Sequence, residues 1–566
     1  MAKKITPRPK TVTAKSAART ANEPLIPDRW LPWIPVVIGA LVFCTGLTNE
    51  MLGIDDHTAT VDNPAVRDFN LFTSINLGMY APVTWAFYSI AYIMGKDSPF
   101  WYHLLSLIVH AFNIYLVFQL VLRLQPDKKT ALAVALLFAI HPVQVESIAW
   151  IAGFSTPLFS MFYLMACLNY LDYTERPGLM RSYWLALLLF VLACLSKSAA
   201  VTLPLTFVVF DLWRKPAISR SRQLIGYAPF FLLSLFFGLL TIYSRNVSGT
   251  NINATGSNFS LLERLMVLCY TPVFYWYNTL FPFKLNIYYS FNRVNGQLPW
   301  PYLVSPIILT GSSFAAWYYR HKAPWLWFGL LFFFANVSVM LPFVSQGTFE
   351  FIADHYNYLA IIGTCFILVQ GWKALQGKLP DISGLLRWIG YAWVVLLLVL
   401  CLRQVRIWKD NNTVVTNAID NGYHQNGLMY AGRAKDLGKR GKIKEAIQEF
   451  NKALEINPSI YEAYQYRGGL YGVMKQYDKS VADLSKFLEQ YPNDAEQHYN
   501  RGLSLLNLNR MQEAIADFNK TLELNPGFTR AYRARGNAYK AIGETAKGEA
   551  DLAEWEKRQG TEEGRR

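Results

Sequence analysis

Five short polar clusters stand out in the first 402 residues, because this part of the chain is otherwise strongly apolar. The first cluster places two adjacent carboxylates, Asp55 and Asp56, in the loop that follows the first apolar run. Such a pair is costly unless it is hydrogen-bonded, holds a metal or takes part in proton transfer. The other clusters hold further titratable or cationic groups: His141 and Glu146, Lys197, Arg245, and Asp354 with His355 and Tyr356.

Each cluster alone has a simple structural explanation. An exposed acidic pair is usually solvated, a His-Pro step such as His141-Pro142 usually caps a helix, and a lone lysine near a membrane interface usually snorkels. Together they supply a candidate base or metal pair and several cations, which suits the handling of a lipid-linked phosphate. A transporter would more often carry charges at mid-membrane and show symmetry between its halves, and the sequence shows neither.

The elements that must position these clusters are membrane-spanning helices. Charged residues make up only 16% of the chain and hydrophobic residues 52%, against roughly 25% charged in an ordinary soluble domain. A span needs about 20 apolar residues, and the stretch 261–281 is interpreted as a re-entrant or interfacial helix. Eleven spans are predicted, near 31–48, 99–122, 130–149, 152–171, 183–198, 199–213, 223–243, 302–319, 323–343, 357–372 and 386–402.

The excess of basic residues predicts the orientation. The chain has 54 Lys and Arg against 39 Asp and Glu, and most of the excess of 15 lies before Arg403. Charge placed in the apolar part argues against nucleic acid as the partner and indicates cytoplasmic loops. The N-terminus is then cytoplasmic, while all five clusters and the C-terminal tail face the periplasm or lumen.

The polar tail repeats with a period of 34 residues, as its proline and glycine columns show (Pro458, Pro492, Pro526; Gly468, Gly502, Gly536). This period is typical of tetratricopeptide repeats, which stack paired helices into a solenoid. The predicted fold class is all-α, with a polytopic helical domain followed by this α-solenoid. The predicted parts are a disordered basic arm at 1–30, a multispanning domain at 31–402, a degenerate helical connection at 403–426, about four repeats at 427–560 and a tail at 561–566.

Two sets of side chains stand out in the repeats. Arg433, Arg467, Arg501 and Arg535 precede Glu449, Asp483, Asp517 and Asp551 by sixteen residues. We expect each arginine to pair with the acid of its own repeat, because a semi-buried guanidinium needs a partner; the alternative is a ladder that grips an acidic ligand. A mixed groove suited to an extended peptide of an acceptor protein, or to another subunit, is predicted from Glu462, Gln465, Tyr499, Arg530, Arg533, Asn537 and Lys540.

In their order along the chain, these motifs resemble a known family. The resemblance is to the transmembrane and tetratricopeptide-repeat O-mannosyltransferases and their bacterial relatives, which are multispanning glycosyltransferases of the C superfamily (GT-C). It implies transfer of a sugar from a polyprenyl-phosphate donor to Ser or Thr hydroxyls of a protein, in the endoplasmic reticulum or at the bacterial inner membrane. The residues that carry it are Asp55-Asp56-His57 through Asp62-Asn63-Pro64, Tyr80-Ala81-Pro82-Val83-Thr84, Tyr102-His103, His141-Pro142 through Glu146-Ser147, Leu195-Ser196-Lys197 and Ala353-Asp354-His355-Tyr356.

The implied chemistry gives each cluster an expected role. A hydroxyl that attacks an anomeric carbon needs a base, for which we expect Asp55, with Asp56 orienting it or sharing a divalent metal, Mg or Mn, that the reaction does not demand. One displacement predicts inversion. Lys197, Arg245 and His355 are expected to neutralise the donor phosphate, although many relatives carry arginine where this chain has His355. His141, Glu146, Asp354 and Tyr356 are expected to position the sugar or the acceptor.

Two other functions fit the same sequence. One is a non-catalytic membrane scaffold that displays the repeats, although a scaffold needs a single span and would tolerate alanine at Asp55. The other is a lipid-linked oligosaccharide ligase or polymerase, which a lipid or glycan acceptor would reveal.

Overall fold

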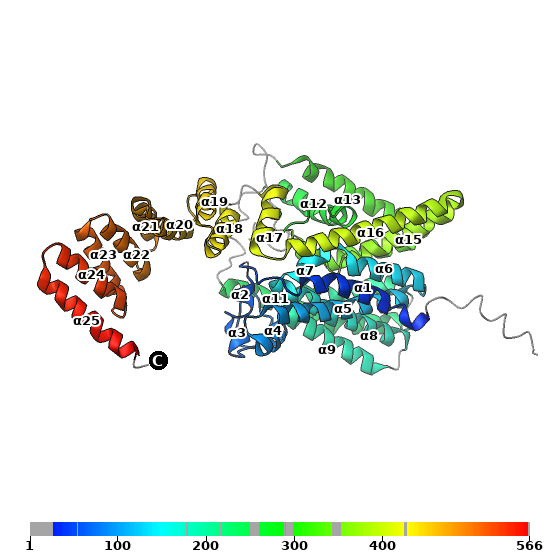
Figure 1. Cartoon of the computed structure of the whole chain (residues 1–566). Coiled ribbons are helices and arrows are strands. Elements are labelled where there is room, and N and C mark those ends of the chain that lie inside the picture. The colour runs from blue at the N-terminus through cyan, green and yellow to red at the C-terminus, as the bar shows by residue number, and fades with distance from the viewer. Residues whose placement is uncertain are drawn as a thin grey trace, which may run out of the picture.

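The computed structural model describes residues 27–53, 55–176, 179–214, 217–248, 260–287, 289, 298–341, 352–423 and 427–563, so most of the predicted basic arm lies outside the described residues. Within these ranges every regular element is a helix, and the only β pairing is one isolated bridge between Asn76 and Met79. The all-α prediction is therefore confirmed there. Figure 1 shows a bundle of helices from one end of which a row of paired helices extends.

The bundle has a core in which α5, α6, α8, α9 and α10 pack with α14 and α15. By contrast, the most apolar stretches of α11 and α16 are only 11% and 17% buried within the protein, so both helices present apolar surface outward. The bundle helices are α1 (Trp33–Phe43), α2 (Asp56–Ala59), α3 (Pro64–Arg67), α4 (Pro82–Gly95), α5 (Pro99–Leu124), α6 (Lys128–Ile140), α7 (Val145–Ala149), α8 (Ser155–Glu175), α9 (Met180–Ser196), α10 (Leu203–Trp213), α11 (Arg220–Val247), α12 (Leu261–Leu280), α13 (Trp300–Tyr318), α14 (Pro324–Val337), α15 (Ile361–Lys378) and α16 (Ser383–Ile407).

The expected count of eleven spans is not confirmed. Among the described residues, five helical stretches are long and apolar enough to cross a membrane: Asp28–Gly46, Pro99–Leu124, Ile151–Glu175, Arg220–Val247 and Pro380–Ile407. A sixth is possible if α6 and the bent stretch Pro142–Ala149 count as one. The other expected spans do form helices, but α9, α10 and α14 are short, and α13 and α15 fall outside these criteria. The apolar helices still make the chain an integral membrane protein.

The tail forms the expected four helix pairs. They are α18 (Gly427–Lys439) with α19 (Ile443–Ile456), α20 (Tyr461–Val473) with α21 (Tyr477–Gln490), α22 (Ala495–Asn507) with α23 (Met511–Leu524), and α24 (Thr529–Ala541) with α25 (Thr545–Glu563). The glycine column lies where paired helices approach closely. A Cβ at Gly502 would lie 2.7 Å from the ring of Phe518, so only glycine fits without a shift.

The arginine column pairs as expected. Arg467, for example, donates from Nε and Nη2 to the two carboxylate oxygens of Asp483, at 2.7 and 2.8 Å. Its third nitrogen, Nη1, donates to Asn451 of the preceding repeat at 2.7 Å. The same three-way contact recurs at Arg501 and Arg535, with Ser485 and Asn519 as the preceding partners. Arg433 donates from Nε and Nη2 to a single oxygen of Glu449 and from Nη1 to Thr416, which precedes the first repeat. Each arginine therefore fastens its own helix pair and also joins it to the helix or pair before.

A short helix, α17 (Asn411–Ala418), joins the bundle to the solenoid. Val414, Val415 and Ala418 are buried in one apolar cluster with Trp408 of the bundle and Met429 of the first repeat. Because Arg433 also donates to Thr416 of α17, the hydrogen bonds of the arginine column extend to this helix. The repeats are thus packed against the bundle rather than tethered to it, and Figure 1 shows α2, α7 and α17 at the same end of the bundle.

Candidate active site

The two acidic residues of the first loop lie in different environments. Asp55 is exposed and has a left-handed backbone with φ of 65°, whereas Asp56 is fully buried. The two carboxylate oxygens of Asp56 accept the backbone N–H groups of Leu52 and Ala152, each at 2.8 Å. Asp56 therefore fastens the loop to the turn before α8, while Asp55 remains accessible at the start of α2.

Desolvation raises the pKa of both carboxyls. The pKa of Asp56 rises to about 7, because burial outweighs the two backbone N–H bonds, and the charge of Asp55 raises it further. The surrounding protein also raises the pKa of Asp55 above its ordinary value. A raised pKa makes a carboxylate a stronger base. Asp55 thus combines the access and the basicity that proton abstraction requires.

The acidic pair alone supplies few ligand atoms for a metal. Mg²⁺ and Mn²⁺ need several converging oxygen ligands, but both oxygens of Asp56 already accept backbone N–H groups. In the part of the chain that the structure describes, no group of three or more His, Cys, Asp or Glu side chains could hold a metal ion. The expected sharing of a metal by Asp55 and Asp56 therefore stays a prediction.

A second cluster joins α7 to the segment 353–358. Glu146, only 3% exposed, accepts the backbone N–H of His355 at 3.0 Å and its ring Nδ1–H at 2.8 Å. Burial and the nearby Lys197 cation hold the pKa of His355 well below its usual value. A neutral ring that already donates to Glu146 is suited to hold this carboxylate in place rather than to neutralise a phosphate.

Lys197 lies beside this pair, in the turn after α9. Its Nζ donates to Thr156 Oγ1 at 2.7 Å and lies 5.9 Å from the centre of the Tyr356 ring. The ammonium also interacts electrostatically with Glu146. Three of the five predicted clusters, those of Glu146, Lys197 and Asp354–Tyr356, therefore meet in one place.

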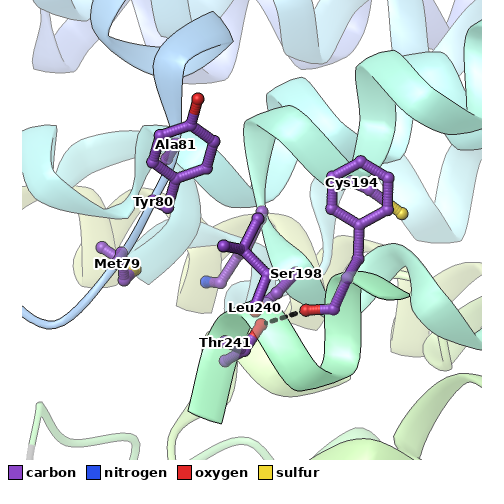
Figure 2. A pocket seen from close by; sticks show the side chains of 9 residues that line it. Met79, Tyr80, Ala81, Cys194, Ser198, Leu240 and Thr241 are labelled. Atoms are coloured by element: carbon purple, nitrogen blue, oxygen red, sulfur yellow. Dashed lines mark hydrogen bonds between the residues drawn. The ribbon is translucent and has the colours of Figure 1, made fainter. Parts of the chain in front are cut away.

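Lys197 also lines a small pocket of about 20 Å³, which is room for about one or two water molecules. Figure 2 shows Met79 and Tyr80 on one side and Leu240 and Thr241 of α11 on the other. The dashed bond is the Thr241 hydroxyl donating to the carbonyl of Phe237 at 2.8 Å. The complete lining is Met79, Tyr80, Ala81, Cys194, Lys197, Ser198, Phe237, Leu240 and Thr241, so a single cation stands among largely apolar side chains.

Arg245 lies near this pocket along α11. It is exposed, and it follows Thr241 by one helical turn. Residues four apart share a face of an α-helix. Arg245 therefore extends the pocket-lining face of α11 towards the end of the helix.

His141 and Asp354 are bonded within the fold. His141 donates from Nε2 to the carbonyl of Thr279 at 2.9 Å, and its Nδ1 accepts the N–H of Val143 at 3.3 Å. Asp354, 3% exposed, accepts the Tyr289 hydroxyl at 2.8 and 2.9 Å to its two oxygens. Both ring nitrogens of His141 are occupied, so these contacts favour a role in shaping the site over direct contact with a sugar.

The predicted groove residues lie on the first helices of the last three pairs, α20, α22 and α24. Arg530 lies 5.8 Å from the ring centre of Tyr499 and 5.5 Å from that of Phe528, and Arg533 lies 4.9 Å from that of Trp555. Glu462, by contrast, accepts the hydroxyl of a neighbouring tyrosine at 3.3 Å. The predicted groove surface is therefore cationic and aromatic at its C-terminal end, and its other predicted residues are Gln465, Asn537 and Lys540.

Two partners in this site belong to none of the five polar clusters. Thr156, which binds Lys197, lies inside a predicted span, and Tyr289, which binds Asp354, lies in a loop without a motif. The only signal for Thr156 is the polar pair Ser155-Thr156 within an otherwise apolar stretch. Neither partner carries a charge, so neither could be found from scarce charges alone.

Comparisons with known proteins give matches to both parts of the chain. Two family models, both described as tetratricopeptide repeat, match residues 433–460 and 495–528. The chain is 23% identical over 435 residues to "Protein O-mannosyl-transferase TMTC3" of Mus musculus, covering 69% of this chain and 46% of that protein. It is 22% identical over 439 residues to "Protein O-mannosyl-transferase F38B6.6" of Caenorhabditis elegans, covering 72% and 60%.

The chain spans about half the length of the curated relatives it matches. Among solved structures, MamA is 19% identical and covers 27% of this chain and 89% of its own, with a TM-score of 0.26. So low a score establishes nothing about the fold. The curated relatives and the repeat matches together show that the chain is similar to the TMTC protein O-mannosyl-transferases and carries tetratricopeptide repeats in its C-terminal part.

Proposed function

We propose that this chain is a protein O-glycosyltransferase of the GT-C type. It moves a sugar, mannose being the first choice from the names of its relatives, from a polyprenyl-phosphate donor to Ser or Thr hydroxyls. The reaction takes place at the periplasmic or luminal face. The observation that carries the proposal is the meeting of Glu146, His355 and Lys197 beside a largely apolar pocket with one cation.

The pocket supports a lipid-phosphate donor. Its apolar walls suit an isoprenoid segment, and the Lys197 ammonium suits a phosphate, with Arg245 as a second cation further along α11. Negative charge develops on the phosphate as its bond to the anomeric carbon breaks. A cation already fixed in the protein stabilises that charge without further reorganisation.

The acceptor side of the reaction falls to Asp55. The acceptor hydroxyl gives its proton to the Asp55 carboxylate while its oxygen forms the new bond to the anomeric carbon. The polyprenyl phosphate leaves with the electron pair of the broken C–O bond. A single displacement of this kind inverts the anomeric configuration and needs no covalent enzyme intermediate.

The solenoid has the complementary role of binding acceptor protein. Its groove offers exposed arginines next to aromatic rings, which suit an extended peptide. Because the solenoid is packed against the bundle through α17, it extends from the end of the bundle that carries the acidic loop.

Purified full-length chain in lipid vesicles tests the function. It is incubated with radiolabelled polyprenyl-phosphate sugars and, in parallel, with protein, lipid or glycan acceptors. We expect label in protein only, and an inverted anomeric centre in the product. Label in the lipid or glycan acceptor instead would favour a ligase or polymerase, and the absence of transfer from every donor would favour a scaffold.

A further inference from the structure

The loop that carries Asp55 and Asp56 contacts the start of the solenoid through residues 50–53. The backbone N–H of Gly53 donates to Oδ1 of Asn411 in α17 at 2.8 Å, and the N–H of Glu50 donates to the carbonyl of Lys409 at 2.9 Å. The first repeat adds a contact. Arg440, in the turn after α18, lies with its Nη2 3.2 Å from the carboxylate of Glu50. Three consecutive elements, the end of α16, α17 and the turn after α18, thus contact residues 50–53.

Asp56 joins the same loop to the bundle. Its carboxylate binds the N–H of Leu52, the residue next to Gly53, and also the N–H of Ala152 in the bundle. Residues 52 and 53 are therefore fixed between the buried Asp56 and Asn411. Asp55 is separated from Gly53 by one residue and directly precedes Asp56.

The contacts at Asn411 are close as well as polar. A Cβ on Gly53 would lie 3.2 Å from Nδ2 of Asn411, so the loop and α17 touch directly. Asn411 is the first residue of α17, behind Asp410, which caps the helix by accepting the N–H of Thr413 at 2.9 Å. The capped helix is in turn buried in the apolar cluster shared with Trp408 and Met429. The anchor for Gly53 is thus itself rigid.

We propose that Asn411, supported by Arg440, is a positioning residue for Asp55. The start of the solenoid fixes the loop. The acceptor-binding repeats and the carboxylate that acts on the acceptor therefore keep a fixed position relative to each other. This inference rests on the proposed function for its catalytic part. Its structural part, that α17 holds the loop, is independent of any reaction.

Variants at Asn411 distinguish the effect of its acceptor oxygen from the effect of its size. Asn411→Leu keeps the approximate size but removes the oxygen that accepts Gly53, whereas Asn411→Asp keeps an oxygen acceptor. Asn412→Leu is the matched control, since this neighbour on α17 has no part in the contact. Full-length protein in lipid nanodiscs is examined by hydrogen–deuterium exchange of residues 49–56 and by the steady-state kinetics of transfer.

We expect Asn411→Leu to speed exchange in residues 49–56 and to lower kcat by about five- to tenfold, the effect of one lost hydrogen bond. KM for donor and acceptor should stay within about twofold, because the anchor does not contact either substrate. Asn411→Asp should restore both readouts, and Asn412→Leu should match the wild type. Glu50→Gln should act in the same direction with a smaller effect, because its partner Arg440 is partly exposed.

Three outcomes would overturn the proposal. They are unchanged exchange in Asn411→Leu, equal effects of the Leu substitutions at 411 and 412, or faster exchange with an unaltered kcat. If the wild type transfers no sugar at all, the proposed function fails. The exchange comparison then decides by itself whether α17 holds the loop.

Discussion

His355 donates from Nδ1 to Oε1 of Glu146 at 2.8 Å, across 209 residues of sequence. The backbone N–H of His355 binds the other oxygen of the same carboxylate at 3.0 Å. This double contact joins the segment 353–358 to α7, next to Lys197. It is the most specific polar link within the candidate site, and it gives a direct prediction.

Replacing Glu146 with Gln should break this link. One carboxamide oxygen can accept one N–H, but the amide NH₂ then faces the second donor. Hydrogen bonds to charged groups contribute about 1.5–3 kcal/mol each, so we expect a loss of stability of that order and a large loss of transfer. Thermal unfolding and transfer rate measure the two effects. Glu489→Gln, an exposed carboxylate paired with Lys486, is the control, and equal losses in the two variants would contradict the account.

Lys197 should control use of the donor. Replacing it with Met keeps the length of the side chain but removes the cation from the pocket. If the ammonium acts on the phosphate in the transition state, kcat/KM for the donor should fall by about 10²- to 10³-fold, the effect of losing one fixed charge-stabilising group. A variant that keeps kcat/KM within threefold of the wild type would show that the phosphate binds elsewhere.

The buried carboxyl of Asp56 makes the loop sensitive to pH. Its folded pKa of about 7 lies above its ordinary value of 3.8, so the folded protein binds this proton more tightly than the unfolded chain does. The stability that follows is fully present below about pH 4 and is lost as pH rises through 7. Asp56→Asn should lose this dependence. We therefore expect the Tm of the wild type to fall relative to the Tm of the variant as pH rises from 4 to 7. A constant difference in Tm would refute the raised pKa of Asp56.

The arginine column should stabilise the solenoid through its double contacts. Arg501 binds both oxygens of Asp517 and also Ser485 of the preceding repeat. Lysine cannot reproduce this fork, so Arg501→Lys should destabilise the repeats by about 1–3 kcal/mol. Arg510→Lys, in an exposed pair with Glu513, should have a much smaller effect, because solvent screens this pair. Hydrogen–deuterium exchange of α21 to α23 measures both, and similar effects would remove the column as a stabilising feature.

The cationic end of the groove should bind acceptor by charge as well as by shape. Arg530→Gln with Arg533→Gln removes two exposed cations that lie over aromatic rings. Binding of an acceptor peptide to the full chain should weaken about tenfold or more and lose much of its salt dependence. Fluorescence anisotropy at two salt concentrations measures this. Unchanged affinity would place acceptor binding on another surface.

Local periodicity made the solenoid predictable, but not all of its contacts. The spacing of 16 residues puts Arg467 opposite Asp483 within one helix pair, so this pairing follows from the sequence. The bond from Arg467 to Asn451 depends on how one pair stacks on the next, which no single-repeat pattern contains.

The membrane domain was less predictable, for physical reasons. Hydropathy gives apolar runs, but α10 is an 11-residue helix packed in the core, and an apolar run does not show whether it crosses a membrane or fills a bundle. The adjacent positions of Asp55 and Asp56 in the sequence likewise could not show which carboxylate is exposed and which is buried. Asp55 has a left-handed backbone, whereas the buried carboxylate of Asp56 accepts the N–H groups of Leu52 and of Ala152, which lies 96 residues further along the chain.

The central claim is that the exposed Asp55 carboxylate takes the proton of the acceptor hydroxyl. Transfer by Asp55→Asn, compared with the wild type and with the exposed control Asp68→Asn, tests it most directly. General-base catalysis contributes about 10²- to 10⁴-fold, so we predict a loss of at least about 10²-fold in kcat with unchanged Tm and unchanged donor binding, and wild-type rates for Asp68→Asn. Retention of more than about a tenth of the wild-type kcat by Asp55→Asn would contradict the account.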